Sequence, residues 1–142
     1  MPKNTVHKIK FDIEEECVIL GISSGFADYR MAWEINKSLE IQLLLSDHSM
    51  EVYDKKTSTN NLFRIHHCYI EETLTNFYLV RNKQSHIFMV PERPQIDYYL
   101  FIKDLHEISL EEIVSVLRAI NGITAVFDFS NESIDATDHL TF

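Results

Sequence analysis

Apolar residues occur along this chain in short runs whose spacing changes between a strand pattern and a helix pattern. Two β-branched runs, Val6 to Phe11 and Cys17 to Ser23, are separated by an acidic patch and predict two strands joined by a turn. From Asp28 the apolar positions recur at about 100° per residue. This spacing predicts a helix over residues 28–40 with Asp28 as its N-cap.

The middle of the chain has the spacing of consecutive strands. The short apolar runs that share this pattern are, in chain order, 41–45, 50–53, 62–70, 77–81 and 87–90. Polar segments separate them, and we expect a tight turn at 46–49 and a loop over 54–61. Consecutive strands most often pair with each other, which favours an antiparallel meander.

The last third of the chain predicts a β-α-β unit. Tyr98 to Ile102 has the composition of a strand, and Ser109 with Glu112 forms the capping box of a following helix. Asn121-Gly122 supplies a residue that can take the left-handed conformation at the end of that helix. Ile123 to Phe129 is again a strand, so we expect the two strands to be parallel with a right-handed crossover.

Together these elements predict one α+β domain that spans residues 1–142. The expected architecture is a mostly antiparallel sheet with two helices packed on one face and a C-terminal β-α-β unit. The order of the elements resembles a ferredoxin-like sandwich that is enlarged by hairpins. A sheet of this kind has edge strands that invite dimerisation, so a homodimer is an open alternative.

Composition and charge restrict the partners of this domain. Lys and Arg number 13 and Asp and Glu number 22, for a net charge of -9, which opposes binding to nucleic acid. The chain has no apolar run of signal-peptide or membrane-spanning length, so we expect a cytoplasmic protein that does not enter the membrane. Cys17 and Cys68 show no paired spacing and are expected to be reduced and buried.

The motifs with the spacing of reactive sites favour structural interpretations. In a strand His66 and Cys68 face one side while His67 faces the other, so these residues do not predict a metal site. The stretch Gly21-Ile22-Ser23-Ser24-Gly25 matches the Gly-x-Ser-x-Gly pattern but lacks the parallel sheet that this motif requires. The chain contains no nucleotide-binding loop, and no catalytic residue or cofactor is predicted.

The first helix carries two unusual positions. Asn36 falls on its apolar face, where a buried amide needs hydrogen-bond partners, so we expect it to bond to a neighbouring loop or strand. Arg30 lies on the outer face, where it can pair with Glu34 four residues later. Arg30 stands beside Trp33, and both residue types are enriched in binding hot spots, so the outer face is a candidate partner contact.

A polar connection between two apolar segments identifies a family. The stretch Val90-Pro91-Glu92-x-x-x-Ile96-Asp97-Tyr98 resembles the signature of the bacterial IPExxxVDY family, small proteins without an assigned function. Asp28-Tyr29-Arg30, Trp33 and Asn36-Lys37 resemble that family's other recurring segment. The motif residues are therefore Asp28, Tyr29, Asn36, Pro91 and Pro94. The resemblance implies no activity, cofactor or catalytic residue.

Physical reasoning gives the connection a structural role. Pro91 and Pro94 restrict its backbone and make it stiff. Glu92 and Asp97 can accept backbone N–H bonds or pair with arginines, and the candidate partners are Arg30, Arg81 and Arg93. A rigid crossover that these carboxylates hold in place is favoured over a ligand-binding loop.

The function that these features favour is a non-enzymatic, cytoplasmic interaction module that binds an unidentified protein partner or itself. The candidate binding residues are Arg30, Trp33, Glu92, Asp97 and Tyr98. One alternative is a small-ligand-binding regulatory domain that uses the connection and the start of the first helix. A second alternative is an enzyme of unknown type that uses Glu92, Asp97 and Arg30.

Overall fold

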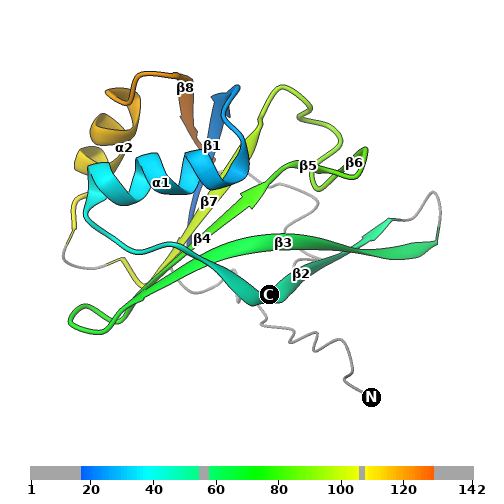
Figure 1. The fold of residues 1–142 in the computed structure, drawn as a ribbon, viewed down its shortest axis with the longest axis horizontal. Coiled ribbons are helices and arrows are strands. Elements are labelled where there is room, and N and C mark those ends of the chain that lie inside the picture. The colour runs from blue at the N-terminus through cyan, green and yellow to red at the C-terminus, as the bar shows by residue number, and fades with distance from the viewer. Residues whose placement is uncertain (1–16, 55–57, 106–107, 130–142) are drawn as a thin grey trace.

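The computed structural model describes residues 17–54, 58–105 and 108–129 and shows an antiparallel sheet with both helices on one face (Figure 1). The elements are β1 (Cys17–Ser24), α1 (Asp28–Leu39), β2 (Leu44–Asp54), β3 (Thr59–Ile70), β4 (Thr75–Arg81), β5 (Lys83–Gln84), β6 (Ile87–Phe88), β7 (Tyr98–Lys103), α2 (Leu110–Arg118) and β8 (Ile123–Asp128). The strand predicted at Val6 to Phe11 lies outside the described residues.

The main sheet has six strands in the order β2-β3-β4-β7-β1-β8. Both β7 and β8 pair antiparallel with β1, so β7 and β8 are parallel to each other with α2 between them in the chain. This confirms the predicted β-α-β unit, with β1 inserted between its strands. Strands β8, β1, β7 and β4 with the two helices form the ferredoxin-like part, and the β2–β3 hairpin enlarges it.

Several predicted boundaries in the middle of the chain are wrong. One strand, β2 (Leu44–Asp54), replaces the two strands predicted at 41–45 and 50–53, and residues 41–43 lie outside it. The polar residues after Leu45 make a register shift before Ser49. Strands β2 and β3 also extend into the expected loop, where Asp54 pairs with Thr59. Ladder hydrogen bonds hold this outer part of the hairpin, and they need no apolar side chains.

The prediction for Ile87 to Val90 is only partly correct. The strand there ends at Phe88, and it pairs with β5 in a separate two-stranded ribbon. Met89 and Val90 leave the strand and are buried against the main sheet. Because β7 follows this detour and pairs with β4, the meander β2-β3-β4 continues directly into the centre of the sheet.

One of the two predicted helix N-caps is wrong and the other is confirmed. Helix α1 begins at Asp28, and Ala27 is its N-cap without a side-chain hydrogen bond, so the predicted cap at Asp28 is wrong. The Asp28 carboxylate instead accepts from the Tyr29 N–H and pairs with Arg64 of β3 at 3.0 Å. Helix α2 has the predicted cap, because the Ser109 hydroxyl accepts from the Glu112 N–H.

Apolar side chains cover both faces of the sheet. The helix-facing core contains residues of both helices and of the central strands, among them Leu20, Ile22, Met31, Ile35, Leu100, Ile113 and Leu117. The opposite core contains Ile19, Phe63, Ile65, Val80, Tyr99, Phe101 and Phe129. Strand β7 is buried on both faces, so it is the central strand in packing as well as in order.

Two adjacent tyrosines of β7 are fully buried in different ways. Tyr98 faces the helices, and its hydroxyl donates to the Phe26 carbonyl at 2.5 Å. Tyr99 faces the opposite core, where its hydroxyl has no hydrogen-bond partner among the described residues. Burial raises the pKa of Tyr98 to about 12 and also raises the pKa of Tyr99.

Removing the two hydroxyls should therefore have different effects on the free energy of unfolding. Tyr99→Phe is expected to leave stability unchanged or to raise it by about 1 kcal/mol, because a buried unpaired hydroxyl is lost. Tyr98→Phe is expected to lower stability by about 1 kcal/mol, because the Phe26 carbonyl loses its donor. Urea denaturation of both variants measures the difference, and equal losses would contradict the assignment.

Candidate functional site

The connection Val90–Tyr98 is a pair of consecutive turns between the β5–β6 ribbon and β7. The Arg93 N–H donates to the Val90 carbonyl, and the Ile96 N–H donates to the Arg93 carbonyl, each at 3.1 Å. Pro91 and Pro94 each occupy the second position of one turn, where their fixed φ is favourable. The connection is therefore stiff, as predicted, and folded back on itself.

One buried amide holds both turns. Asn82 is fully buried, and its Nδ2 donates to the carbonyls of Arg93 at 3.1 Å and Ile96 at 2.8 Å. Its Oδ1 accepts from the Val90 N–H at 2.8 Å. The backbone N–H of Asn82 also donates to the Asp97 carbonyl at 2.8 Å. The side chain of a single residue thus bonds to the backbone at both ends of the connection.

The far end of the connection is attached to the end of β1. The Asp97 N–H donates to the Ile22 carbonyl at 2.9 Å, and the Asp97 carboxylate accepts from the Ser24 N–H at 2.8 Å. The Ser23 hydroxyl donates to the Gln95 carbonyl at 3.0 Å. The prediction that Asp97 accepts a backbone N–H is confirmed, and this bond joins the connection to the strand beside β7.

Glu92 does not have the predicted anchoring contacts. Its side chain is exposed, and the described residues give it no hydrogen bond or ion pair. It lies within the first turn, which the backbone and Asn82 already hold, so its carboxylate points to solvent. Of the two motif carboxylates, Asp97 anchors the connection, and Glu92 is available at the surface.

The Gly-x-Ser-x-Gly stretch is structural. A side chain at Gly21 would collide with the ring of Phe129, which lies against the sheet there. The Arg93 guanidinium lies over the same ring, 4.4 Å from its centroid. The Ser23 hydroxyl bonds to the connection, and the Ser24 hydroxyl donates to the Gly122 carbonyl at 2.7 Å. Both hydroxyls therefore donate to backbone carbonyls.

The outer side of α1 exposes two aromatic side chains with cations beside them. Tyr29 is 74% exposed and Trp33 is 52% exposed. The Arg30 guanidinium lies 5.8 Å and the Lys37 ammonium 5.1 Å from the centroid of the Trp33 ring. We call Tyr29, Arg30, Trp33, Lys37 and the exposed Leu44 the α1 surface. The predicted pair of Arg30 with Glu34 is confirmed at 2.8 Å.

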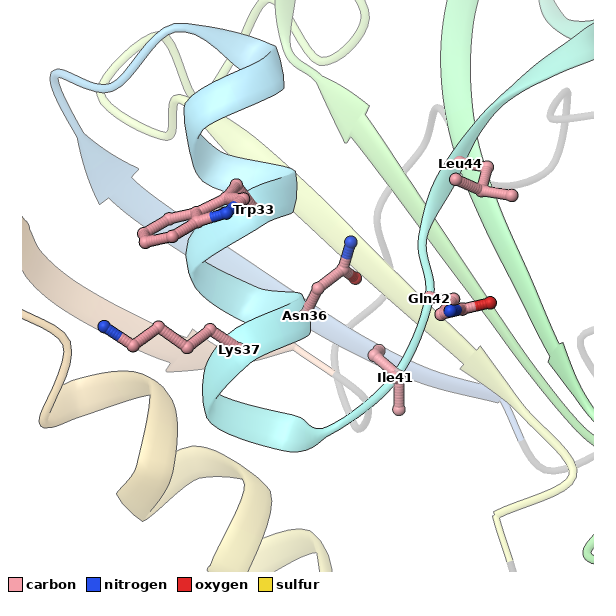
Figure 2. A pocket seen from close by; sticks show the side chains of 6 residues that line it. All are labelled: Trp33, Asn36, Lys37, Ile41, Gln42 and Leu44. Atoms are coloured by element: carbon pink, nitrogen blue, oxygen red, sulfur yellow. The ribbon is translucent and has the colours of Figure 1, made fainter.

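A hollow of about 600 Å³ opens beside Trp33. Figure 2 shows the side chains that line it, which come from α1 and from the segment that leads into β2, namely Trp33, Asn36, Lys37, Ile41, Gln42 and Leu44. Asn36 donates to the Leu43 carbonyl at 3.1 Å and accepts from the Leu43 N–H at 2.7 Å. The predicted hydrogen bond of Asn36 to a neighbouring segment is confirmed, and it fixes one wall of the hollow.

The five candidate binding residues occupy two regions that meet at Phe26. The Arg30 guanidinium lies 5.0 Å from the centroid of the Phe26 ring, and the Tyr98 hydroxyl donates to the Phe26 carbonyl. Arg30 and Trp33 are exposed, whereas Tyr98 is fully buried and cannot touch a partner in this conformation. Neither Glu92 nor Asp97 pairs with Arg30 in the described part of the chain.

The histidine-cysteine stretch of β3 is divided between the two faces of the sheet, as predicted. Cys68 lies in the helix-facing core, while His67 stacks on Tyr78 with ring centroids 4.6 Å apart and bonds to Asn76 at 2.7 Å. Burial lowers the pKa of His66. Residues 17–54, 58–105 and 108–129 contain no group of three or more His, Cys, Asp or Glu side chains that could hold a metal ion.

Two residues of this region were missed by the sequence reasoning. Asn82 directly follows a predicted strand, where a lone asparagine is typical of an ordinary turn. Phe26 lies in the short segment before α1 and has no periodic signal. The only local signal for Asn82 was its position before a connection with two prolines, whose backbone groups need partners outside a strand ladder.

Replacing Asn82 should unfold the connection before it affects any surface. We expect Asn82→Ala to lower the free energy of unfolding by about 3 kcal/mol, because three hydrogen bonds are lost and the Val90 N–H and the Ile96 carbonyl are left without a side-chain partner. The exposed Asn60 is the matched control, and Asn60→Ala is expected to change stability by less than about 0.5 kcal/mol. Thermal and urea denaturation compare the two variants, and equal effects would show that the Asn82 bonds contribute little.

Comparison with protein-family models, with curated proteins and with solved structures found no match to this chain. The resemblance of the Val90–Tyr98 connection and of α1 to the IPExxxVDY family stays a prediction from the motif residues. No helix in the described residues is long and apolar enough to cross a membrane. Any function of the α1 surface is therefore inferred from the contacts within this chain alone.

Proposed function

We propose that this chain is a non-enzymatic interaction module that binds a protein partner through the α1 surface. The observation that carries this proposal is the exposed Trp33, which stands between two cations at the rim of a hollow. Tryptophan and arginine are the residue types most enriched among binding hot spots. An exposed tryptophan next to Tyr29 supplies a large contact area with few rotatable bonds.

The charges of the α1 surface favour a partner with acidic groups around an apolar anchor. Arg30 is paired with Glu34, but no carboxylate of the described residues pairs with Lys37. Lys37 lies at the hollow and is exposed, so an acidic group of a partner can reach it. An apolar side chain of the same partner would be buried against Trp33 and Leu44.

The α1 surface is held in place before any partner arrives. The Asp28–Arg64 ion pair joins the start of α1 to β3, and the Asn36–Leu43 bonds join its end to the segment before β2. Arg30 is held between Glu34 and the rings of Phe26 and Trp33. Side chains that are ordered in advance lose less entropy on binding, which supports a recognition role.

The hollow supports one second candidate, a regulatory domain that binds a small ligand. Its volume of about 600 Å³ is within the usual range for ligand sites. Side chains of α1 and of residues 41–44 line the hollow, which lies open to solvent. An open hollow suits a protein segment better than an enclosed small molecule. For the enzyme hypothesis, Glu92, Asp97 and Arg30 show no contact with one another that would favour it.

The two thiols support a location in the reducing cytoplasm. Cys17 and Cys68 are both free, and Cys68 is buried in the helix-facing core. Burial raises the pKa of Cys17 to about 12, which keeps it as an unreactive thiol. Unpaired, buried cysteines are typical of proteins from reducing compartments.

The proposal predicts that Trp33→Ala abolishes capture of a partner from extract of the native cell without changing the melting temperature. Loss of a central tryptophan is expected to weaken binding by about 30-fold or more, because hot-spot truncations cost about 2 kcal/mol or more. Tyr53→Ala, which removes an exposed aromatic of β2 outside the α1 surface, is the matched control and should bind normally. Glu92→Gln tests the exposed motif carboxylate in the same way.

Equal capture of a partner by Trp33→Ala and by the control Tyr53→Ala would show that the α1 surface is not the binding site. A small metabolite that raises the melting temperature of the wild type, and not of Trp33→Ala, would instead support the regulatory-domain candidate through mass-action stabilisation. A drop in the melting temperature of Trp33→Ala would show that Trp33 has a structural role.

A further inference from the structure

We propose that one occupant of the hollow is a second copy of this chain, whose β3–β4 turn places Leu74 against Trp33. The β3–β4 turn comprises residues 71–74, between Ile70 and Thr75. This inference rests on the proposed function, because it uses the α1 surface as the receiving site. It identifies the partner by its chemistry, namely an exposed leucine that follows two carboxylates on one turn.

The β3–β4 turn displays its leucine in an unusual conformation. Leu74 is 61% exposed and has a φ of +57°, a left-handed conformation that bulky residues rarely adopt. The Leu74 N–H donates to the Glu71 carbonyl at 3.4 Å, and the Thr73 hydroxyl donates to the Thr75 hydroxyl at 2.8 Å. Thr75 is fully buried and donates to the Asp104 carbonyl at 3.1 Å. The buried Thr75 therefore anchors the turn, and the Leu74 side chain faces solvent.

The charges of the turn are complementary to those of the hollow. Glu71 and Glu72 are exposed, and no cation in the described part of the chain pairs with either of them. Lys37 at the hollow has no carboxylate partner there either. Glu40 is also exposed at the end of α1, so the attraction is local to Lys37 and its side of Trp33. Bringing the turn to the hollow pairs opposite charges that are unpaired within one chain.

The turn and the hollow lie toward the same end of β3. Leu44, which lines the hollow, pairs with His67, and β3 ends at Ile70. Figure 1 shows the end of α1 and the β3–β4 turn on the same side of the molecule. Two copies related by a two-fold axis near this end can each give a turn and receive one, which closes the assembly as a dimer. Two contacts of this size make a weak interface, as in transient complexes.

Sedimentation velocity on the full chain tests the dimer, at protein concentrations up to about 1 mM because the contact is small. The wild type is expected to shift reversibly from monomer to dimer as its concentration rises. Leu74→Asn should remain monomeric and fold at least as well, because asparagine tolerates positive φ. Leu62→Asn, which changes an exposed leucine of β3 outside the turn, should dimerise normally.

A charge exchange identifies which surfaces meet. Lys37→Glu alone and Glu72→Lys alone should each weaken dimerisation by about tenfold, because each places like charges opposite one another. An equimolar mixture of the two variants should restore it, since every turn then finds a hollow of opposite charge. Failure of the mixture to restore association would overturn the proposed pairing.

The same measurements separate this inference from the proposed function. A wild type that is monomeric throughout, with a partner that Trp33→Ala fails to capture, would overturn the dimer and leave the proposed function in place. Dimerisation that Leu74→Asn does not reduce would also overturn the proposed contact of Leu74 with Trp33. Dimerisation that both Leu74→Asn and Trp33→Ala abolish would support it, with or without a second partner on the α1 surface.

Discussion

The fold depends on the hydrogen bonds of one buried amide. Asn82 has no exposed surface, and its side chain meets three backbone groups of the Val90–Tyr98 connection. Without them the Val90 N–H and the Ile96 carbonyl would be buried without a partner, and the Arg93 carbonyl would keep only its bond from the Ile96 N–H. Unpaired backbone groups in a core are costly. The three Asn82 bonds hold a segment that has few hydrogen bonds to neighbouring strands. The position at which β7 enters the sheet follows from this arrangement.

The connection also holds in place the short segment that leads into α1. Asp97 bonds to the end of β1 and Tyr98 bonds to Phe26, so the short segment before α1 is tied to the connection. Arg30 then lies against the ring of Phe26 and reaches Trp33. The two segments are therefore neighbours in one structure. The α1 segment exposes its aromatic side chains, whereas the connection exposes Glu92 and is otherwise held by backbone bonds.

The sequence predicted those parts of the fold that depend on local periodicity. Helix α1, the cap at Ser109 and the β-α-β unit around α2 all follow from spacing that one face of a helix or strand imposes. The outer hairpin was predicted too short, because its outer residues on β3, Thr59 and Asn60, are polar and exposed and carry no apolar alternation. Asn36 was predictable because an amide on an apolar face must find partners, whereas Asn82 required knowledge of which distant carbonyls lack donors.

The register shift in β2 has a consequence for how copies of this chain can assemble. Strand β2 forms one edge of the sheet, and an uninterrupted edge of its length would be a template for adding further strands without end. The irregularity between Leu45 and Ser49 breaks the straight row of backbone donors and acceptors that such growth requires. The irregularity therefore makes β2 a less regular template for the addition of a further strand.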